Sequence, residues 1–301
     1  MKIEVALTAY LNENKCIKGL SENTIKCQEY IINEYYKTLK IVNIEEMNSI
    51  MIQKYIDKLR AKGLSKATIR SRYCALMAFV NHYYKTGIIK FNPYYHVRKV
   101  RKYRAHKIPL RADEMQKMVT VKCRHAMKIE YQHKRNRAII GLFIYAGMRV
   151  GEIIRLTLED VSASSGYIRV INGKFNIDRV VPIAEPLTTW LKEYEEVRLK
   201  CRADYYFIGL FDKTKMERNS ITRIIKRYAK TAGIRRNVCS HILRHSFASQ
   251  MLKGKVDMEK LRIIMGHSNV EMTAVYAKPD FAMIKEALMK SPLVEYFGGK
   301  T

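Results

Sequence analysis

The sequence predicts a mainly α-helical protein of two domains, with a small antiparallel β-sheet in the second. Three observations predict this fold class. Apolar residues recur at helical spacing through most of the 301 residues. Only between Gly166 and Ile183 does the pattern change to β-rich runs. A basic segment without a clear period, residues 94–109, separates two stretches, and the chain is long enough for each to have a core of its own.

The first domain, residues 1–97, is predicted to be entirely helical. Further helices are expected near residues 21–39, 49–61 and 65–85, where glycines and an Asn-Pro pair mark the stops. The chain opens with an apolar stripe at helical spacing, formed by Ile3, Ala6, Leu7, Tyr10 and Leu11.

Two helix starts in this domain repeat each other, at residues 19–26 and 63–70. Each has a glycine stop, a serine cap and a helix whose first turns carry a threonine and then a base. Helix N-termini present free N–H groups and a partial positive charge to phosphates. Ordinary helix capping explains the same residues, but the charge of the chain favours contact with DNA. The predicted contacts are Ser21, Thr24, Lys26, Ser65, Thr68 and Arg70.

The charge of the chain is strongly positive. There are 56 Lys and Arg against 28 Asp and Glu, a formal net charge of +28. Such an excess indicates a polyanionic partner, and nucleic acid is the first expectation. A solubility device or a ribosomal-type protein is the alternative. A membrane surface is less favoured, because the charge is spread along the whole chain.

Residues 98–107 are interpreted as an extended linker that crosses the nucleic-acid backbone. A merely solvated loop is the alternative. The predicted DNA contacts in this linker are Arg98, Lys99, Arg101, Lys102 and Arg104.

Several other classes of protein are disfavoured. No apolar run approaches the roughly 18 residues of a membrane span, and the start of the chain lacks the apolar region of a signal peptide. We therefore expect a cytoplasmic, nucleoid-associated protein. Six scattered cysteines without a C-x-x-C pair suit neither a zinc ribbon nor a disulfide framework. With no acidic cluster at metal-ligand spacing and no P-loop, we expect no metal and no cofactor.

The second domain, residues 108–301, is predicted to mix helices with one hairpin. Helices are expected from Arg111, at about 134–145, at 187–201 and at 219–231. The runs 167–171 and 179–183 form the hairpin, with Lys174 at its tip. The tail after Lys278 is amphipathic, and it packs either on its own domain or on a neighbouring protomer. Its apolar face is Phe281, Ile284, Leu288 and Leu293.

The stretch from Ser240 to Tyr276 carries three polar clusters. Ser240 is predicted to cap a helix on which His241 and Arg244, three residues apart, share one face. That helix ends at Gly254, and Asp257 caps a second one over 258–265. Gly266 suits the left-handed position after this helix, so His267 falls on a tight corner.

These residue types suit chemistry on a phosphate. Arginine clamps phosphate oxygens in a bidentate manner, histidine moves protons and a tyrosine hydroxyl acts as a nucleophile. Taken singly, a His-x-x-Arg pair is more often a solvated helix face, and one of 20 tyrosines is more often a packing residue. The set as a whole favours a site.

Together with the segment Ala146–Ile153, these clusters resemble the tyrosine recombinase (phage integrase) family, and the compact Xer-like members in particular. The four motif blocks occur in the family's order over about 130 residues. The resemblance implies a SAM-like, core-binding first domain and a catalytic second domain. It also implies roles at the matching positions, with Tyr276 as nucleophile and Arg149 and Arg244 as clamps on the phosphate. Lys174 would be the leaving-group acid, His241 would assist proton transfer and His267 would hydrogen-bond the phosphate.

Two further observations bear on these roles, one at Glu152 and one in the hairpin. Glu152, three residues after Arg149, is predicted to pair with a cation and hold the site's geometry. The family's hairpin reads Gly-Lys-Gly-x-Lys, whereas Phe175 and Ile177 stand here in place of the second glycine and the second lysine. Lys174 keeps its position, but this departure weakens its assignment.

The expected function is therefore site-specific recombination, in which duplex DNA is cleaved and rejoined through a 3′-phosphotyrosyl intermediate. Double-stranded DNA is the expected partner, with four protomers on two sites and accessory DNA-bending proteins as further candidates. A type IB topoisomerase and a non-catalytic architectural DNA-binding protein are the alternatives. The DNA site, the host and the choice between integration, excision, resolution and transposition stay open.

Overall fold

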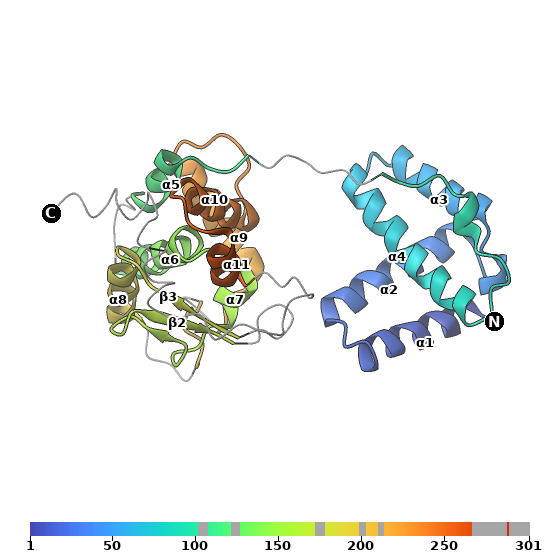
Figure 1. Cartoon of the computed structure of the whole chain (residues 1–301), viewed down its shortest axis with the longest axis horizontal. Helices are drawn as coiled ribbons and strands as arrows, with labels where there is room; N and C mark the ends of the chain where they lie inside the picture. Colours follow the sequence, from blue (N-terminus) through green and yellow to red (C-terminus); the bar gives the residue numbers. More distant parts are fainter. Residues whose placement is uncertain are drawn as a thin grey trace. The chain divides into compact units, whose positions relative to one another are not determined.

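The computed structural model describes residues 1–101, 108–121, 127–171, 178–198, 203–209, 214–266 and 288. It divides into two compact units, Met1–His106 and Lys107–Thr301, called unit 1 and unit 2 below (Figure 1). The predicted fold class is confirmed, because unit 1 is helical and unit 2 combines helices with a three-stranded antiparallel sheet.

Unit 1 contains the four expected helices. They are α1 (Ile3–Cys16), α2 (Glu22–Leu39), α3 (Ser49–Ala61) and α4 (Lys66–Lys85), with short 3₁₀ turns η1 (Ile44–Glu46) and η2 (Pro93–His96). The predicted bounds of α2, α3 and α4 agree with the structure to within a residue. Glycine and asparagine signals mark these bounds because a left-handed or extended residue cannot continue a helix.

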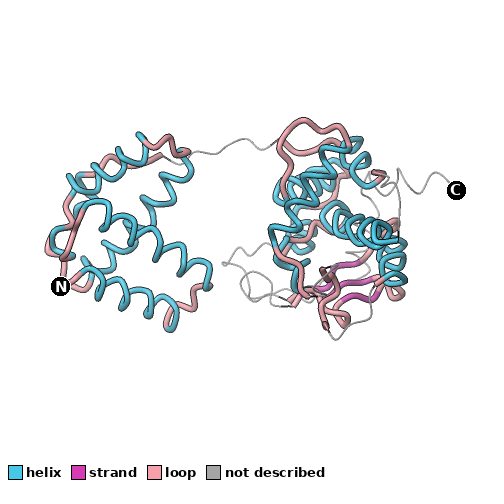
Figure 2. Tube along the Cα trace, turned by 180° about the vertical axis from the view of Figure 1, so that it is seen from behind, coloured by secondary structure: helices cyan, strands magenta, loops and turns pink. Residues whose placement is uncertain are grey.

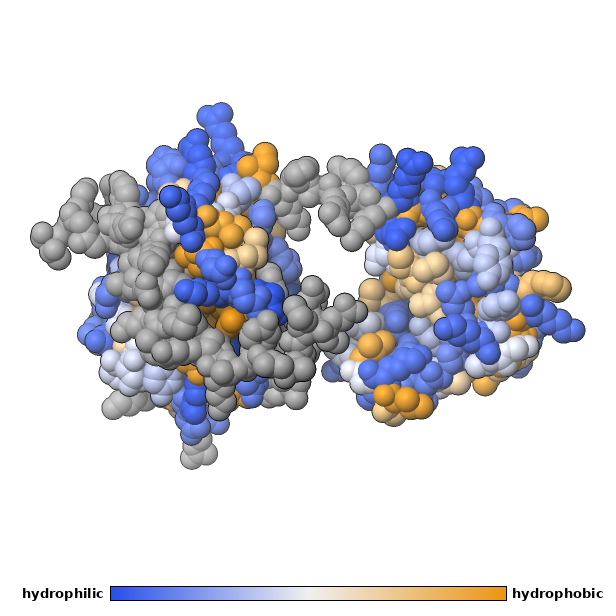
Figure 3. Space-filling model, viewed as in Figure 1, coloured by the Kyte–Doolittle hydropathy of each residue, from blue (hydrophilic) through white to orange (hydrophobic). Residues whose placement is uncertain are grey.

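Tyrosines form much of the core of unit 1. Three T-shaped pairs, Tyr10–Phe79, Tyr35–Tyr55 and Tyr73–Tyr94, have ring centroids 5.1–5.2 Å apart. Edge-to-face pairs of this kind contribute about 0.5–1.5 kcal/mol each beyond the area they bury. Many of the chain's tyrosines are therefore accounted for by packing. Hydrophilic residues cover most of the visible face of unit 1, between scattered apolar patches (Figure 3).

Unit 2 is built around its longest helix, α6 (Met127–Tyr145). The side chains of Ile139, Leu142 and Phe143 are fully buried. Gly141 allows α8 to approach closely, since a Cβ there would lie 2.9 Å from Leu187 and Trp190. Elsewhere in the described parts of unit 2 the chain forms α5 (Ala112–Val119), α7 (Val150–Arg155), α8 (Leu187–Val197), α9 (Arg218–Thr231), α10 (Ser240–Lys253) and α11 (Met258–Met265).

The sheet of unit 2 has the order β1 (Val161–Ser162), β2 (Tyr167–Val170) and β3 (Arg179–Pro182). It lies at one side of the helices (Figure 2). β2 and β3 pair antiparallel with Ile168 opposite Val181 and Val170 opposite Arg179, which confirms the predicted hairpin. Strand β1 was not predicted, because two residues are too few to show a period.

Three predicted helix bounds were wrong. Ser240 is the first residue of α10 and not its cap, because Cys239 takes the extended cap conformation with φ −134° and ψ 168°. α6 begins at residue 127 instead of 134, since Met127, Ile129 and Tyr131 alternate with polar residues there and do not show the helical period. α8 ends at Val197 instead of residue 201. The next residue, Arg198, is extended, and its guanidinium donates to the carbonyls of Ala203 and Tyr205.

The tail contributes one described residue, Leu288, and its other predicted apolar residues lie outside the described ranges. Leu288 is 1% exposed and packs in a small cluster with residues of α10 and α11, including Phe247, Met251 and Leu261. At this position the tail therefore packs on its own unit. No helix among the described residues has the length and apolar character needed to cross a membrane.

Candidate active site

The turn that carries Arg149 is fixed by Gly147 and by Glu152. Gly147 has φ +58°, and a Cβ at this position would lie 2.3 Å from the ring of Phe247 on α10. Only glycine fits both the left-handed backbone and this close approach. Arg149 follows as the extended cap of α7, and its N–H donates to Glu152 Oε2 over 2.8 Å. The sequence thus places the arginine at a rigid corner between α6 and α7.

Glu152 is a buried carboxylate between two arginines. Its side chain is 2% exposed. Oε1 accepts from Arg149 Nη1 at 2.8 Å and from Arg179 Nη1 at 3.0 Å, and Oε2 accepts from Arg179 Nη2 at 2.9 Å. Burial alone would raise the pKa of Glu152, but the hydrogen bonds and charges of Arg179 and Arg149 lower it to about 2. The predicted pairing of Glu152 with a cation is confirmed.

Arg244 lies on α10, one turn after His241. It is 6% exposed, and its guanidinium donates to the carbonyls of Gly147 and Met265. Burial and the charge of Arg149 lower the pKa of Arg244 to about 9. No carboxylate of the described residues pairs directly with this guanidinium, and a buried cation of this kind favours an anion beside it.

All three arginines donate hydrogen bonds to carbonyls at the C-terminal end of α11. Arg179 Nε donates to Ile264 O at 3.0 Å, Arg244 to Met265 O, and Arg149 Nη2 to Gly266 O at 2.7 Å. The last carbonyls of a helix lack partners within the helix and carry a partial negative charge, so they attract cations. Gly266 has φ +59°, as predicted, and it is the last described residue before His267.

The resulting arrangement is an anion site. The cluster consists of three guanidinium groups and one carboxylate, so it carries a net charge of two positive. Among the described residues, no three His, Cys, Asp or Glu side chains lie together as a metal ligand set. Cations held at rigid corners stabilise the charge that develops on a phosphate during transfer.

The structure brings some of the predicted catalytic residues together and leaves others undescribed. Arg149, Glu152 and Arg244 meet in the cluster. His241 lies on the exposed first turn of α10. Lys174, His267 and Tyr276 lie outside the described residues. Lys174 belongs to the segment that joins β2 to β3, which the pair Val170 and Arg179 closes.

Arg179 was missed by the sequence reasoning, which treated it only as part of a β-rich run. The sequence nevertheless contained a signal that Arg179 is buried and paired. Side chains two residues apart in a strand share one face, so Arg179 lies on the same face as Val181, which is fully buried. An arginine on the core face of a strand requires a partner, and Glu152 supplies it.

The predicted DNA contacts of unit 1 lie at helix starts and beyond η2. Ser21 and Ser65 cap α2 and α4 by accepting the N–H of Thr24 at 3.4 Å and of Thr68 at 3.1 Å. Lys26 pairs with Glu22 at 2.7 Å, and Arg70 donates to the carbonyl of Val100. Arg98, Lys99 and Arg101 are exposed, whereas Lys102 and Arg104 lie outside the described residues.

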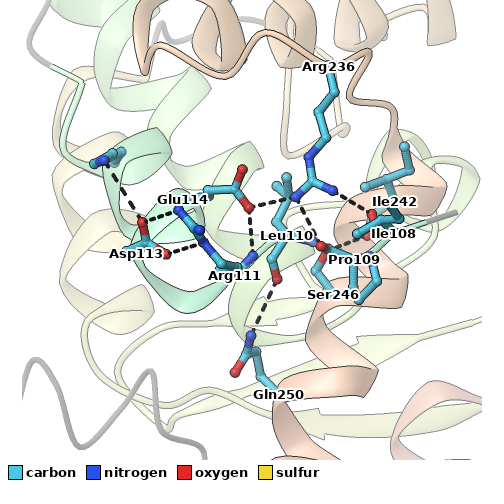
Figure 4. A network of polar contacts seen from close by, with 11 residues as sticks. Ile108, Pro109, Leu110, Arg111, Asp113, Glu114, Arg236, Ile242, Ser246 and Gln250 are labelled. Carbon is cyan, nitrogen blue, oxygen red and sulfur yellow. Dashed lines mark hydrogen bonds and ion pairs between the residues drawn. The ribbon is translucent and has the colours of Figure 1, made fainter.

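The chain entering unit 2 is anchored to α10 (Figure 4). The N–H of Leu110 donates to Ser246 Oγ at 2.7 Å, and its carbonyl accepts from Gln250 at 3.4 Å. Arg236 donates to the carbonyls of Ile108 and Pro109, both at 3.0 Å. The chain that directly follows the predicted linker is therefore attached, through Leu110, to the helix that carries Arg244.

Comparison with known proteins gives consistent matches. The sequence profile of the phage integrase family matches residues 109–283, and that of the phage integrase N-terminal SAM-like domain matches residues 7–87. The tyrosine recombinase XerC of Thermodesulfovibrio yellowstonii is 30% identical over 292 residues, which cover 95% of each chain.

Two solved structures share the fold. A lambda integrase dimer bound to a COC′ core site has a TM-score of 0.71 at 17% identity, covering 93% of this chain and 100% of that one. A lambda integrase tetramer bound to a Holliday junction has a TM-score of 0.71 at 17% identity, covering 90% of this chain and 76% of that one.

Proposed function

Because the chain belongs to the phage integrase family of tyrosine recombinases, we propose that it acts as a site-specific recombinase that cleaves and rejoins duplex DNA. The observation that supports this most directly is the cluster of Arg149, Arg179 and Arg244 around the single buried carboxylate of Glu152. A phosphodiester brings the negative charge that this cluster lacks.

The proposed reaction is a pair of phosphoryl transfers. The phenol oxygen of Tyr276 attacks the scissile phosphorus, a 3′-phosphotyrosyl bond forms and the bond to the 5′-oxygen breaks. His241 takes the phenol proton, and Lys174 gives a proton to the leaving 5′-oxygen. A 5′-hydroxyl of the partner strand then gives its proton to Lys174 and attacks the phosphotyrosine. The bond to the phenol oxygen breaks, and this oxygen takes its proton back from His241, which restores Tyr276. The covalent link conserves the energy of the phosphodiester, so rejoining needs no nucleotide cofactor.

Arg149 and Arg244 are proposed to hold the two non-bridging oxygens, with His267 donating a further hydrogen bond. This role is supported by the way the protein already holds both arginine side chains in place. Backbone carbonyls of Gly147, Met265 and Gly266 already fix both guanidinium groups, so little rearrangement is needed when charge develops. A preorganised donor of this kind commonly contributes about 100-fold or more to a rate.

The DNA partner is proposed to be a duplex to which residues 1–97, residues 108–301 and the linker 98–107 each contribute contacts. A solvent-open hollow of about 590 Å³ in unit 2, lined by Lys226, Lys230, Arg235 and Arg236, offers further positive surface. Strand exchange involves two duplexes, so we propose a tetramer, the assembly named for the lambda integrase complex on a Holliday junction. Accessory DNA-bending proteins and a nucleoid location belong to the same proposal.

The proposal is tested by trapping the covalent intermediate. A bound duplex is selected from a random-sequence pool and then nicked next to the cleavage position, so that cleavage cannot be reversed. The native chain should form an adduct that survives SDS, and Tyr276→Phe should bind the duplex equally well but form none.

Tyr228→Phe is the matched control. Its phenol is 1% exposed and lies 3.4 Å from His133 Nδ1, so the loss of this hydroxyl should leave the adduct intact. An adduct of normal yield from Tyr276→Phe would assign the nucleophile elsewhere. Tight binding without any adduct from the native chain would favour an architectural DNA-binding protein. Relaxation of supercoiled DNA without a preferred site would favour a topoisomerase.

A further inference from the structure

Arg179 differs from Arg149 and Arg244 in the partners of its N–H donors. All three of its guanidinium nitrogens bind protein, with Nε on Ile264 O and Nη1 and Nη2 on the two oxygens of Glu152. Its side chain is 7% exposed, compared with 21% for Arg149. Each guanidinium nitrogen of Arg179 is therefore engaged with the protein, and its side chain is less accessible than that of Arg149.

The charge of Glu152 is divided between Arg179 and Arg149. Arg179 forms the two-bond fork, with distances of 2.9 and 3.0 Å, whereas the side chain of Arg149 makes one bond of 2.8 Å. A forked arginine–carboxylate pair is the stronger and more directional of the two arrangements. Without Arg179, the negative charge of Glu152 would act on Arg149 alone. It would then offset the positive charge that this arginine offers to the phosphate.

We propose that Arg179 is a positioning residue: by occupying Glu152, it holds Arg149 in place and leaves the positive charge of Arg149 available to the phosphate. The proposal rests on the proposed strand-transfer function of this site, and it assigns to Arg179 no contact with DNA. The pair of Arg179 and Glu152 holds the rest of the cluster at a net charge of two positive, carried by Arg149 and Arg244.

The same side chain also packs against the end of α11. Through Ile264 O it ties the start of β3 to the last turn of α11. A Cβ on Gly266 would lie 2.8 Å from Arg179 Nη1, so the guanidinium packs directly beneath the turn that leads to His267. Arg179 therefore joins three segments of the site, namely the hairpin of Lys174, the turn of Arg149 and the corner before His267.

The experiment compares four variants of the full chain with the native protein. Arg179→Gln removes the charge. Arg179→Lys keeps the charge but loses the fork. Arg179→Gln combined with Glu152→Gln removes the whole buried pair. Arg169→Gln is the matched control, because Arg169 lies on the neighbouring strand β2, is exposed and donates to Glu159 O.

Three quantities are measured for each variant. They are the single-turnover rate of adduct formation on the nicked duplex, the dissociation constant for the intact duplex, and the rise in melting temperature caused by inorganic phosphate without DNA. The first two separate the chemical step from binding. The third needs no DNA, and its difference between each variant and the native protein reports the arginine cluster, so it remains informative if no protein forms an adduct and the proposed function itself fails.

We expect Arg179→Gln to slow adduct formation by at least about tenfold, because one positive charge leaves the cluster, while duplex affinity changes by less than about threefold. Its phosphate-induced stabilisation should fall in parallel. The double variant should recover most of both losses, since Arg149 is again free of an unpaired carboxylate. Arg179→Lys should be intermediate, and Arg169→Gln should match the native protein.

A purely structural role predicts the opposite order, with the double variant at least as impaired as the single. That order, or a native rate in folded Arg179→Gln, overturns the proposal. If Arg179→Gln is unfolded at the assay temperature, the rate of adduct formation by the double variant tests the proposal by itself. A rate within about tenfold of the native rate supports the charge argument, and a larger loss with a native melting temperature contradicts it.

Discussion

Glu152 couples the stability of the protein to pH. Its pKa is lowered from 4.5 to about 2 in the folded state, so its charge contributes stability fully above about pH 4.5. That contribution falls as the pH drops through the window from 4.5 to 2, because the unfolded chain takes up the proton first. The shift corresponds to about 3 kcal/mol, of which about 2 kcal/mol is lost between pH 6 and pH 3.

Urea unfolding at pH 6 and pH 3 measures this effect. Glu152→Gln should be the less stable protein at pH 6, and its loss of stability between the two pH values should be smaller than the native loss by about 2 kcal/mol. The other carboxylates cancel in this difference. Equal losses in the two proteins would mean that Glu152 is not held ionised by its arginines.

Gly147 limits what the turn before Arg149 tolerates. Gly147→Ala places a methyl group 2.3 Å from the Phe247 ring at φ +58°, whereas Gly166→Ala at φ +73° meets nothing within 4 Å. Gly166→Ala should cost about 1–2 kcal/mol from the left-handed backbone alone. Gly147→Ala should cost a further 1–3 kcal/mol or so, because the ring must move. Thermal unfolding of both variants checks this, and equal costs would contradict the predicted close contact.

At the scale of elements, the starts of α2 and α4 have two explanations, capping and phosphate binding. Ser65 accepts the N–H of Thr68, which shows the cap, and the side chain of Arg70 reaches Val100 O within the unit. Aspartate caps helices as well as serine does, but it places a negative charge where a phosphate would bind. The two explanations therefore separate in Ser21→Asp and Ser65→Asp.

If these helix starts contact DNA, both aspartate variants should keep the native melting temperature and bind duplex about tenfold more weakly, which corresponds to about 1.4 kcal/mol. Ser65→Ala is the complementary control, since it should lose about 1 kcal/mol of stability without adding charge. Native affinity in both aspartate variants would leave capping as the whole role of these serines.

At the scale of the whole molecule, Leu288 decides how the tail contributes to assembly. It is buried with Phe247 and Met251 of its own unit, so Leu288→Ala should destabilise the chain by about 2–5 kcal/mol. The loss should be the same at protein concentrations tenfold apart. Leu252→Ala on α10, which is 42% exposed, should change stability by less than about 0.5 kcal/mol. A native unfolding midpoint that rises with protein concentration, and loses this dependence in Leu288→Ala, would instead place the residue between protomers.

The sequence by itself determined the local structure and the identity of the motifs. Helix stops at Gly63 and Gly254, the cap at Asp257 and the left-handed Gly266 were all predictable, because each depends on backbone preferences within a few residues. The hairpin around Lys174 was predictable for the same reason. The family was predictable because its motifs are short and occur in a fixed order, although composition alone indicated only a nucleic-acid partner.

Only the tertiary structure decided which side chains meet. Arg149 and Gly266 are 117 positions apart, yet the arginine's guanidinium binds that glycine's carbonyl. Arg179 lay within a correctly predicted strand, but its role depends on a carboxylate 27 positions away and on the end of α11. Leu288 reads as one residue of an amphipathic face, and its packing on α10 and α11 came from the fold. Ion pairs and core contacts depend on distance in space. A local pattern indicates which side chains are buried, but not which distant residue each of them meets.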